Sequence, residues 1–294
     1  HRGFKGDLSK APMGTGPYTL AEFAVGGKAI LKRTGKPYWG GEVYLDGIHY
    51  FDHGSASAAS LAALASGQVD QIFEFDLLSL ELANSLPNIK IYEAVTAQTG
   101  CLRMRMTEKP FDDIRIRKAI VACSDNARHR ELICSGRGDI GENHHVAPIH
   151  PEYFKLPALK QDYALAKKLL ADAGHANGLD ITIDVGNTNG PWQQQACEIL
   201  KAQLAPAGVR LNLNVMPAPK YWEIWDKAPF GLTVWGHRPL GTMVLSVGYR
   251  SGVPWNETAY ANPAFDKALS DAEALVDSKE RSNAMRKVEK ILQD

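Results

Sequence analysis

The clearest signal of the fold is in residues 179–216, "LDITIDVGNTNGPWQQQACEILKAQLAPAGVRLNLNVM". It begins with alternating apolar and polar residues that are typical of a strand, and then passes through a loop rich in Gly and Asn. A helix and a second alternating run follow. A strand, a helix and a strand in this order indicate an α/β unit. A further strand-like run at residues 230–236, "FGLTVWG", completes it.

Helices are predicted before and after this unit in the sequence. Residues 162–173 place small and apolar side chains on one helical face, with Asp162 as the N-cap and Gly174 as the stop. Residues 262–294 predict two further helices, and the second of them begins at Asp277 as its N-cap. The second half of the chain is therefore predicted to be α/β.

The first hundred residues have shorter elements. Three strand-like runs separated by turn residues predict an antiparallel meander: residues 17–25, 28–34 and 41–51. A helix is predicted at residues 55–67, and two further strands at 68–75 and 88–95 enclose a short helix. This order predicts a mixed sheet covered by helices. The pattern changes after Gly100, and we place a lobe boundary near residues 97–106.

Composition limits the kinds of partner. The 294 residues suit two compact lobes, and 33 basic residues balance 33 acidic ones. Because no net positive charge exists to hold a polyanion, we expect no nucleic-acid partner. There is no apolar run of about 20 residues, so no membrane span is expected, and any export signal would lie upstream or have been removed. The four cysteines lack C-x-x-C spacing and are expected to be free thiols.

Several segments resemble, in the same order, the extracellular solute-binding proteins of family 5, which serve ABC importers. "GTGPYTL" and "LKRTGKPYW" at residues 14–20 and 31–39 resemble two early family segments. "KPFDDIRIRKAIVACSD" at residues 109–125 resembles the most diagnostic one, although Asn126 replaces the usual Arg. The helices at residues 162–174 and beyond residue 260 are also similar, so the resemblance covers almost the whole chain.

The resemblance implies a periplasmic-binding-protein-like clamp of type II with an extra domain. It implies that residues 1–100 are a remnant of lobe 1 and that 101–294 form lobe 2, with the hinge near 97–106. The N-terminal part and the C-terminal return of complete members would then be missing. Such proteins are exported to the periplasm, capture a solute between the lobes, and deliver it to an ABC permease. We therefore expect a monomer without catalytic activity and without a cofactor.

Family peptide receptors place a Trp at the end of a cleft-facing strand and an Asp at the fourth position, where it pairs with the ligand's amino group. Here Trp235 and Gly236 fit, but Arg238 stands at the acidic position. A fixed Arg attracts carboxylate or phosphate and repels ammonium. The ligand is therefore expected to present an anionic or strongly accepting group. The alternatives are a structural salt bridge for Arg238 and a purely structural role for His237.

Two further groups of residues are candidates for ligand contacts. The loop at residues 186–192 follows a strand and precedes a helix, so its polar groups could face the same cleft; the candidates there are Asn187, Asn189 and Trp192. Flat apolar surface could come from Trp235, Tyr249 and Trp255. Turn chemistry explains the loop equally well, and core packing is the commoner role of any single aromatic residue.

The segment 139–150 holds an unusual number of titratable residues: Asp139, Glu142, His144, His145 and His150. Such a cluster suggests a transition-metal or haem site, and with it an alternative function as a metal-dependent hydrolase. Adjacent histidines point to different sides of an extended chain, and no H-x-x-x-H spacing occurs, which favours a solvated loop. No nucleophile elbow, P-loop or dinucleotide fingerprint is present. The ligand remains open among peptide, sugar, opine and metal chelate, and a sensory role is a third possibility.

Overall fold

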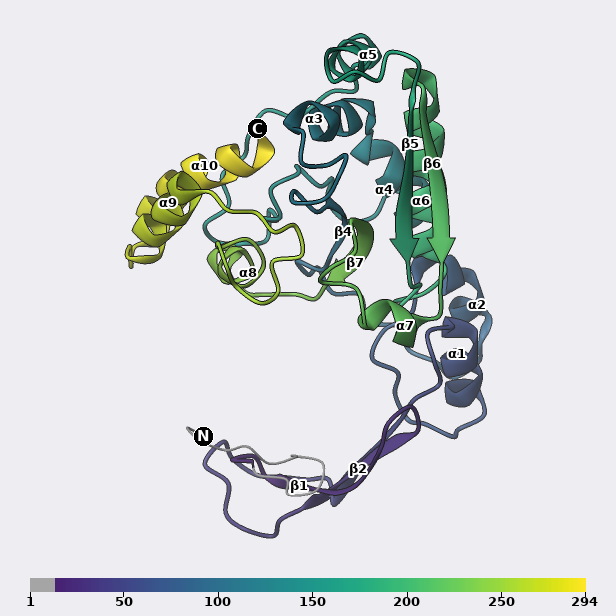
Figure 1. Cartoon of the computed structure of the whole chain (residues 1–294). Coiled ribbons are helices and arrows are strands. Elements are labelled where there is room, and N and C mark those ends of the chain that lie inside the picture. Colours follow the sequence, from purple (N-terminus) through teal and green to yellow (C-terminus); the bar gives the residue numbers. More distant parts are fainter. Residues whose placement is uncertain (1–13) are drawn as a thin grey trace.

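The computed structural model describes residues 14–294 and contains two sheets. The first is an antiparallel meander in the order β1-β2-β3, formed by β1 (Tyr18–Ala24), β2 (Lys28–Arg33) and β3 (Gly47–Phe51). This confirms the predicted meander, although its third strand is shorter than expected. Gly26, with a φ of 68°, permits the tight turn between the first two strands. The meander projects away from the rest of the molecule (Figure 1).

The rest of the N-terminal part is helical or irregular. Helix α1 (Ser57–Ala65) confirms the predicted helix, but its N-cap is Ala56 and no serine side chain caps it. A short 3₁₀ turn, η1 (Leu77–Ser79), leads into α2 (Leu80–Ser85). The two strands predicted at residues 68–75 and 88–95 are not formed. Extended residues become a strand only when a neighbour accepts their hydrogen bonds, and no strand of residues 14–294 lies beside them.

The second sheet belongs to the α/β unit and has the order β4-β7-β5-β6. Its strands are β4 (Thr99–Met104), β5 (Leu179–Val185), β6 (Val209–Val215) and β7 (Phe230–Trp235). Strand β5 runs parallel to both β6 and β7, whereas β4 pairs antiparallel with β7. The carboxyl ends of β5, β6 and β7 and the amino end of β4 therefore lie along one edge, which we call the carboxyl edge.

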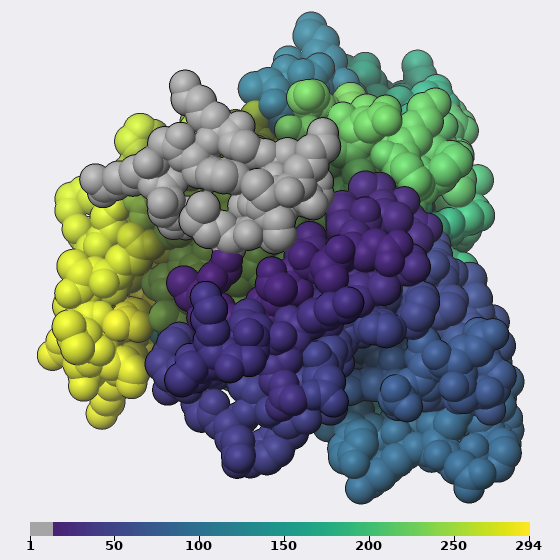
Figure 2. All heavy atoms as spheres, turned by 90° about the horizontal axis from the view of Figure 1, so that it is seen from below, coloured from purple at the N-terminus to yellow at the C-terminus, as the bar shows by residue number. Residues whose placement is uncertain are grey.

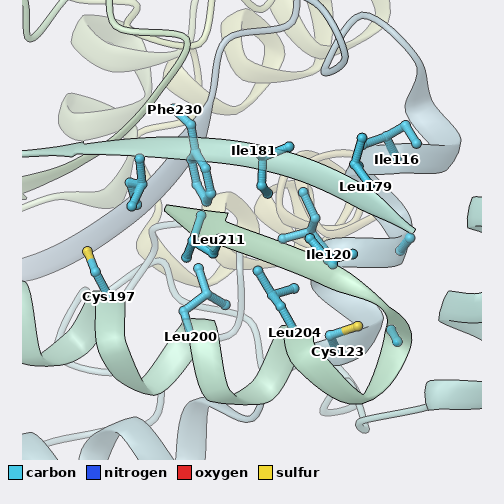
Figure 3. Close-up of a cluster of buried hydrophobic side chains, with 14 of the residues drawn as sticks. Ile116, Ile120, Cys123, Leu179, Ile181, Cys197, Leu200, Leu204, Leu211 and Phe230 are labelled. Carbon is cyan, nitrogen blue, oxygen red and sulfur yellow. The ribbon is translucent and has the colours of Figure 1, made fainter. Parts of the chain in front are cut away.

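Four helices cover this sheet: α3 (Ile114–Cys123), α4 (Asn126–Cys134), α5 (Tyr163–Asp172) and α6 (Trp192–Leu204). Leu200 and Leu204 of α6 point toward Leu211 of β6, in one core with Ile181 and Phe230 (Figure 3). Apolar burial at roughly 25 cal/mol per Å² is what holds the helices on the strands. The sequence predicted α5 and α6.

A second core lies to the C-terminal side. It is built mainly from α8 (Gly241–Gly248), α9 (Pro263–Glu273) and α10 (Ser278–Gln293). The Asp277 side chain accepts hydrogen bonds from the Lys279 and Glu280 amides, which confirms the predicted N-cap of α10. The one-turn helix α7 (Ala218–Trp222) follows β6.

The carboxyl edge faces the N-terminal part of the chain. In Figure 1 the arrowheads of β5 and β6 point down toward α1 and α2, and α7 lies below them. Seen from below in Figure 2, the N-terminal part, purple to blue, lies in front of the green C-terminal half. The predicted α/β class is confirmed. No helix within residues 14–294 is both long and apolar enough to cross a lipid bilayer.

Candidate ligand-binding site

The turn after β7 lies at the carboxyl edge and contains the predicted cation. The Ala97 amide donates to His237 Nδ1 at 3.1 Å, so the turn is fastened to the segment that enters β4. Among the described residues, the guanidinium of Arg238 reaches only backbone carbonyls of its own turn, those of Gly236 at 3.4 Å and His237 at 3.1 Å. Within residues 14–294 no carboxylate lies within 4.0 Å of it. The structural salt bridge considered from the sequence is therefore not formed there.

A continuous chain of aromatic rings begins at Trp235, next to this turn. Trp235 contacts Trp255, Trp255 contacts Trp225, and Trp225 contacts Trp222. Ring centroids are 5.9–6.2 Å apart and ring planes meet at 70–75°, an edge-to-face arrangement that the aromatic quadrupole favours. We call these four rings the tryptophan ladder. Trp235 is only 6% exposed, whereas Trp255 is 48% exposed and Trp222 46%.

Two of the predicted aromatic residues are tied down by their polar atoms. Trp235 Nε1 donates to Glu257 Oε1 at 2.5 Å. The Tyr249 hydroxyl is 3.0 Å from His145 Nδ1, and the His145 ring also packs edge-on against Trp235. Burial lowers the pKa of His145 to about 4, so this imidazole is neutral and structural at neutral pH. Of the three predicted aromatics, Trp255 therefore offers most of the accessible ring surface.

The loop at residues 186–192 lies at the end of β5, beside the N-terminal part. Asn187 Oδ1 accepts from the Gln194 amide at 3.1 Å, and its φ of 46° makes it the turn residue. Asn189 Nδ2 is 3.5 Å from Glu74 Oε1, and Trp192 Nε1 donates to the Asn189 carbonyl at 2.8 Å. Much of the polar capacity of Asn187 and Trp192 is thus used within the loop.

A polar cavity of about 200 Å³ separates this loop from α1. Its wall includes Ser57, Glu74, Asn189, Trp192 and Gln98. Gln98 follows Ala97, which is hydrogen-bonded to the turn after β7. The loop and the turn predicted from sequence therefore lie on either side of the start of β4. They are not joined by a direct hydrogen bond between described residues.

The segment 139–150 is not the solvated loop that its spacing suggested. His144 and His150 are buried, and so is the neighbouring Glu152. His144 Nδ1 accepts from the Val146 amide at 3.3 Å while Nε2 donates to Glu142 Oε2 at 3.2 Å, a pattern that requires the neutral ring. The cause of burial is packing, because Val146 belongs to the C-terminal core. Among residues 14–294 no three His, Cys, Asp or Glu side chains are arranged to hold a metal ion.

This segment instead holds the turn after β7 in place. His150 Nδ1 accepts from the Ala147 amide at 2.9 Å, and Nε2 donates to the Arg238 carbonyl at 3.0 Å. Glu152 Oε1 accepts from the Thr242 amide at 3.1 Å and from its hydroxyl at 3.0 Å, which supplies the cap that α8 lacks within itself. We call His150 and Glu152 the turn clamp.

Replacing His150 with Phe is expected to lower the free energy of unfolding by about 2–3 kcal/mol, because two backbone groups lose their buried partner. Urea denaturation followed by circular dichroism measures this. The exposed His49 of β3 provides the control, since His49→Phe is expected to change stability by less than about 0.5 kcal/mol. Equal effects of the two substitutions would contradict the clamp.

The sequence did not reveal two important features of the site. One is the contact of Trp222 and Trp225 with the rings around Trp255, because nothing in "YWEIWD" indicates it. The buried pair of Arg103 and Glu257 joins residues 154 positions apart and lacks any local signal. The cysteines are free as expected, and burial raises the pKa of Cys101 to about 12, so its thiol is inert.

Comparisons with known proteins place the chain in a family. Residues 2–244 match the model of the bacterial extracellular solute-binding proteins, family 5. Heme-binding protein A of Haemophilus influenzae is 24% identical over 97% of this chain, and the dipeptide-binding protein of Pseudomonas aeruginosa is 23% identical over 98%. The chain spans about half the length of these relatives, 53% and 55% respectively.

Solved structures show the same fold. Helicobacter pylori DppA in complex with the peptide STSA has a TM-score of 0.84 at 24% identity, covering 97% of this chain and 56% of that one. Staphylococcus aureus NikA in complex with Ni(L-His)₂ has a TM-score of 0.85 at 21% identity, covering 99% and 63%. Both relatives are binding proteins rather than enzymes, and no finding supports the hydrolase alternative. The chain belongs to the bacterial extracellular solute-binding proteins of family 5.

Proposed function

We propose that this protein captures a small solute at the carboxyl edge and delivers it to the permease of an ABC importer outside the cytoplasm. The arrangement of the site supports this. Ligands of open α/β sheets bind beyond the carboxyl ends of the strands, and here that edge faces a second part of the chain. Residues 97–106 are proposed as the hinge, with residues 1–100 belonging to lobe 1 and 101–294 to lobe 2.

Closure of the two lobes would follow from ligand contacts made on both sides. A ligand shifts an open–closed equilibrium only by its differential affinity for the two states. Residues from both sides already meet at the cavity beside Asn189 and Glu74. The proposed ligand contacts in lobe 2 are Arg238, His237 and Trp255, supported by Trp235, Tyr249 and the 186–192 loop.

The observation that carries the ligand chemistry is that Arg238 has no acidic partner in the described part of the chain. Its guanidinium has no carboxylate partner within residues 14–294, yet the turn clamp and His237 hold its backbone. A fixed, always charged fork of donors suits a carboxylate or phosphate group. We therefore propose an anionic solute whose recognition does not need a free amino group, although relatives include peptide-, nickel- and heme-binding proteins.

Isothermal titration calorimetry with trialanine and N-acetyltrialanine tests this. Both carry a free carboxylate, so both are expected to bind, and Arg238→Ala is expected to weaken both by about tenfold or more, in line with the loss of a charge-assisted hydrogen bond. Lys227→Ala, which removes an exposed cation on the same lobe, is the control. Binding that depends on the free amine and is unchanged in Arg238→Ala would contradict the proposal.

A further inference from the structure

We infer that the tryptophan ladder is a second subsite, which binds a planar ring carried by the same solute whose anionic group meets Arg238. This inference rests on the proposed function and extends it from the charge of the ligand to its shape. It adds Trp222 and Trp225 to the binding surface and commits to one ligand class, an anion that bears an aromatic ring.

The position of the ladder supports the inference. Trp235 ends β7, and Trp222 ends α7, the helix that follows β6. Both therefore belong to the carboxyl edge, where α7 lies between the sheet and α1 (Figure 1). Arg238 Nη1 donates to the carbonyl of Gly236, the residue that follows Trp235, at 3.4 Å, so the cation lies near the Trp235 end of the ladder.

The exposure of the ladder sets it apart from core packing. Trp235 is buried and Trp225 partly buried, but Trp222 and Trp255 leave nearly half of their surface accessible, 46% and 48%. Trp225 contacts both of these rings, at 5.9 Å from Trp222 and 6.2 Å from Trp255. Two half-exposed tryptophans thus flank a third and together offer flat apolar surface beside a charged group, which is the usual composition of a small-molecule site.

Hydrogen bonds also hold the ladder in place. The Trp225 carbonyl accepts a hydrogen bond from Arg103, and the Asp226 carbonyl accepts one from Arg105 Nη1 at 2.6 Å. Glu257 fixes the Trp235 indole and stands two residues from Trp255. Because these groups are ordered before ligand arrives, little side-chain freedom is lost on binding. An aromatic pair then contributes to affinity beyond its buried area.

A cation is the other kind of ligand that aromatic faces attract. Arg238 argues against it, because a fixed positive charge next to the ladder repels a second one. Choline is therefore included as a probe in the experiment below, and an anion without a ring serves as the matched reference.

The experiment compares N-acetylphenylalanine with N-acetylalanine, two anions that differ by one phenyl ring, using calorimetry on the whole chain. The aromatic probe is expected to bind about tenfold more tightly. Trp255→Ala and Trp222→Ala are each expected to remove most of this preference, measured as the ratio of the two affinities in the same variant. Trp39→Ala, which removes a tryptophan that is 84% exposed in the N-terminal part, is the control and should change nothing.

Three results would overturn the inference: equal affinity for the two probes, a preference that survives both ladder variants, or choline binding that is lost in Trp255→Ala. A failure of the proposed anion site would give a different set of affinities. Arg238→Gln should weaken both anions by the same factor and leave the ring preference intact. If Arg238→Gln has no effect while the preference still depends on Trp255, the ladder stands and the anion site fails.

Discussion

Replacing Arg103 with Met is expected to lower the free energy of unfolding by about 3–5 kcal/mol, the cost of leaving one member of a buried ion pair without its partner. The side chains of Arg103 and Glu257 are only 5% and 3% exposed. Arg103 Nε donates to Glu257, and its other nitrogens reach the Trp225 and Ala228 carbonyls. The variant removes all of these contacts and leaves the Glu257 carboxylate in a site that water cannot reach.

The direction in which a second substitution changes the stability tests whether the unpaired charge causes the loss. Adding Glu257→Gln to Arg103→Met removes the uncompensated charge, while the amide oxygen can still accept from Trp235 Nε1. The double variant is therefore expected to be more stable than Arg103→Met alone, by about 1–2 kcal/mol. Chemical denaturation of the two single variants and the double variant completes a thermodynamic cycle.

The exposed pair of Arg210 and Asp180 is the matched control. Arg210 reaches both carboxylate oxygens, at 2.7 and 2.6 Å, but the two side chains are 58% and 64% exposed. Arg210→Met is expected to cost less than about 1 kcal/mol, because solvent screens the pair. If Arg103→Met proved as mild as Arg210→Met, the pair would not be the anchor of the ladder.

The sequence predicted elements well where periodicity and caps agree. The helix at residues 163–172 and the strands on either side of α6 form as expected, since Asp162 caps the helix and the strands alternate cleanly. Helix α8 was not predicted, because it begins and ends with Gly and its cap comes from Glu152, about 90 residues earlier. Local sequence cannot show a cap that only the tertiary fold supplies.

The same distinction between local and tertiary signals applies to the candidate site. The turn after β7 was found because strand, Trp and cation are adjacent in the sequence. The tryptophan ladder was not, because it joins residues from α7, β7 and two loops that meet only in three dimensions. The histidines at residues 144–150 looked solvated because their spacing is irregular, but the C-terminal core encloses them.

The second large expected effect is a change of folding stability with pH, and it comes from Glu289. Its side chain is fully buried on α10, where Oε1 accepts from the Phe154 amide at 3.2 Å and Oε2 has no hydrogen-bond partner in the described structure. His144 Nε2 is 3.9 Å from Oε2 but donates to Glu142 at 3.2 Å. Burial raises the pKa of Glu289 from 4.5 to about 8, and the nearby Glu142 and Glu152 add to the rise.

Stability should therefore fall as pH rises through the range between these two values. Below pH 4.5 the carboxyl is protonated in both the folded and the unfolded chain, so burial carries no charge penalty. Between pH 4.5 and about 8 the folded state keeps a proton that the unfolded state has lost, and stability decreases with pH. Above about pH 8 the folded protein must hold a buried carboxylate.

Glu289→Gln removes this dependence, because the amide has nearly the same shape and never ionises. The stability of the variant relative to the unmodified protein is expected to rise by on the order of 3–4 kcal/mol between pH 4.5 and pH 8, since one pKa unit corresponds to about 1.4 kcal/mol. Urea denaturation at several pH values measures the difference. Glu280→Gln, at an exposed position in the first turn of the same helix, should leave the pH profile unchanged. A parallel profile for Glu289→Gln would mean that Glu289 is already ionised in the fold, and the raised pKa would be contradicted.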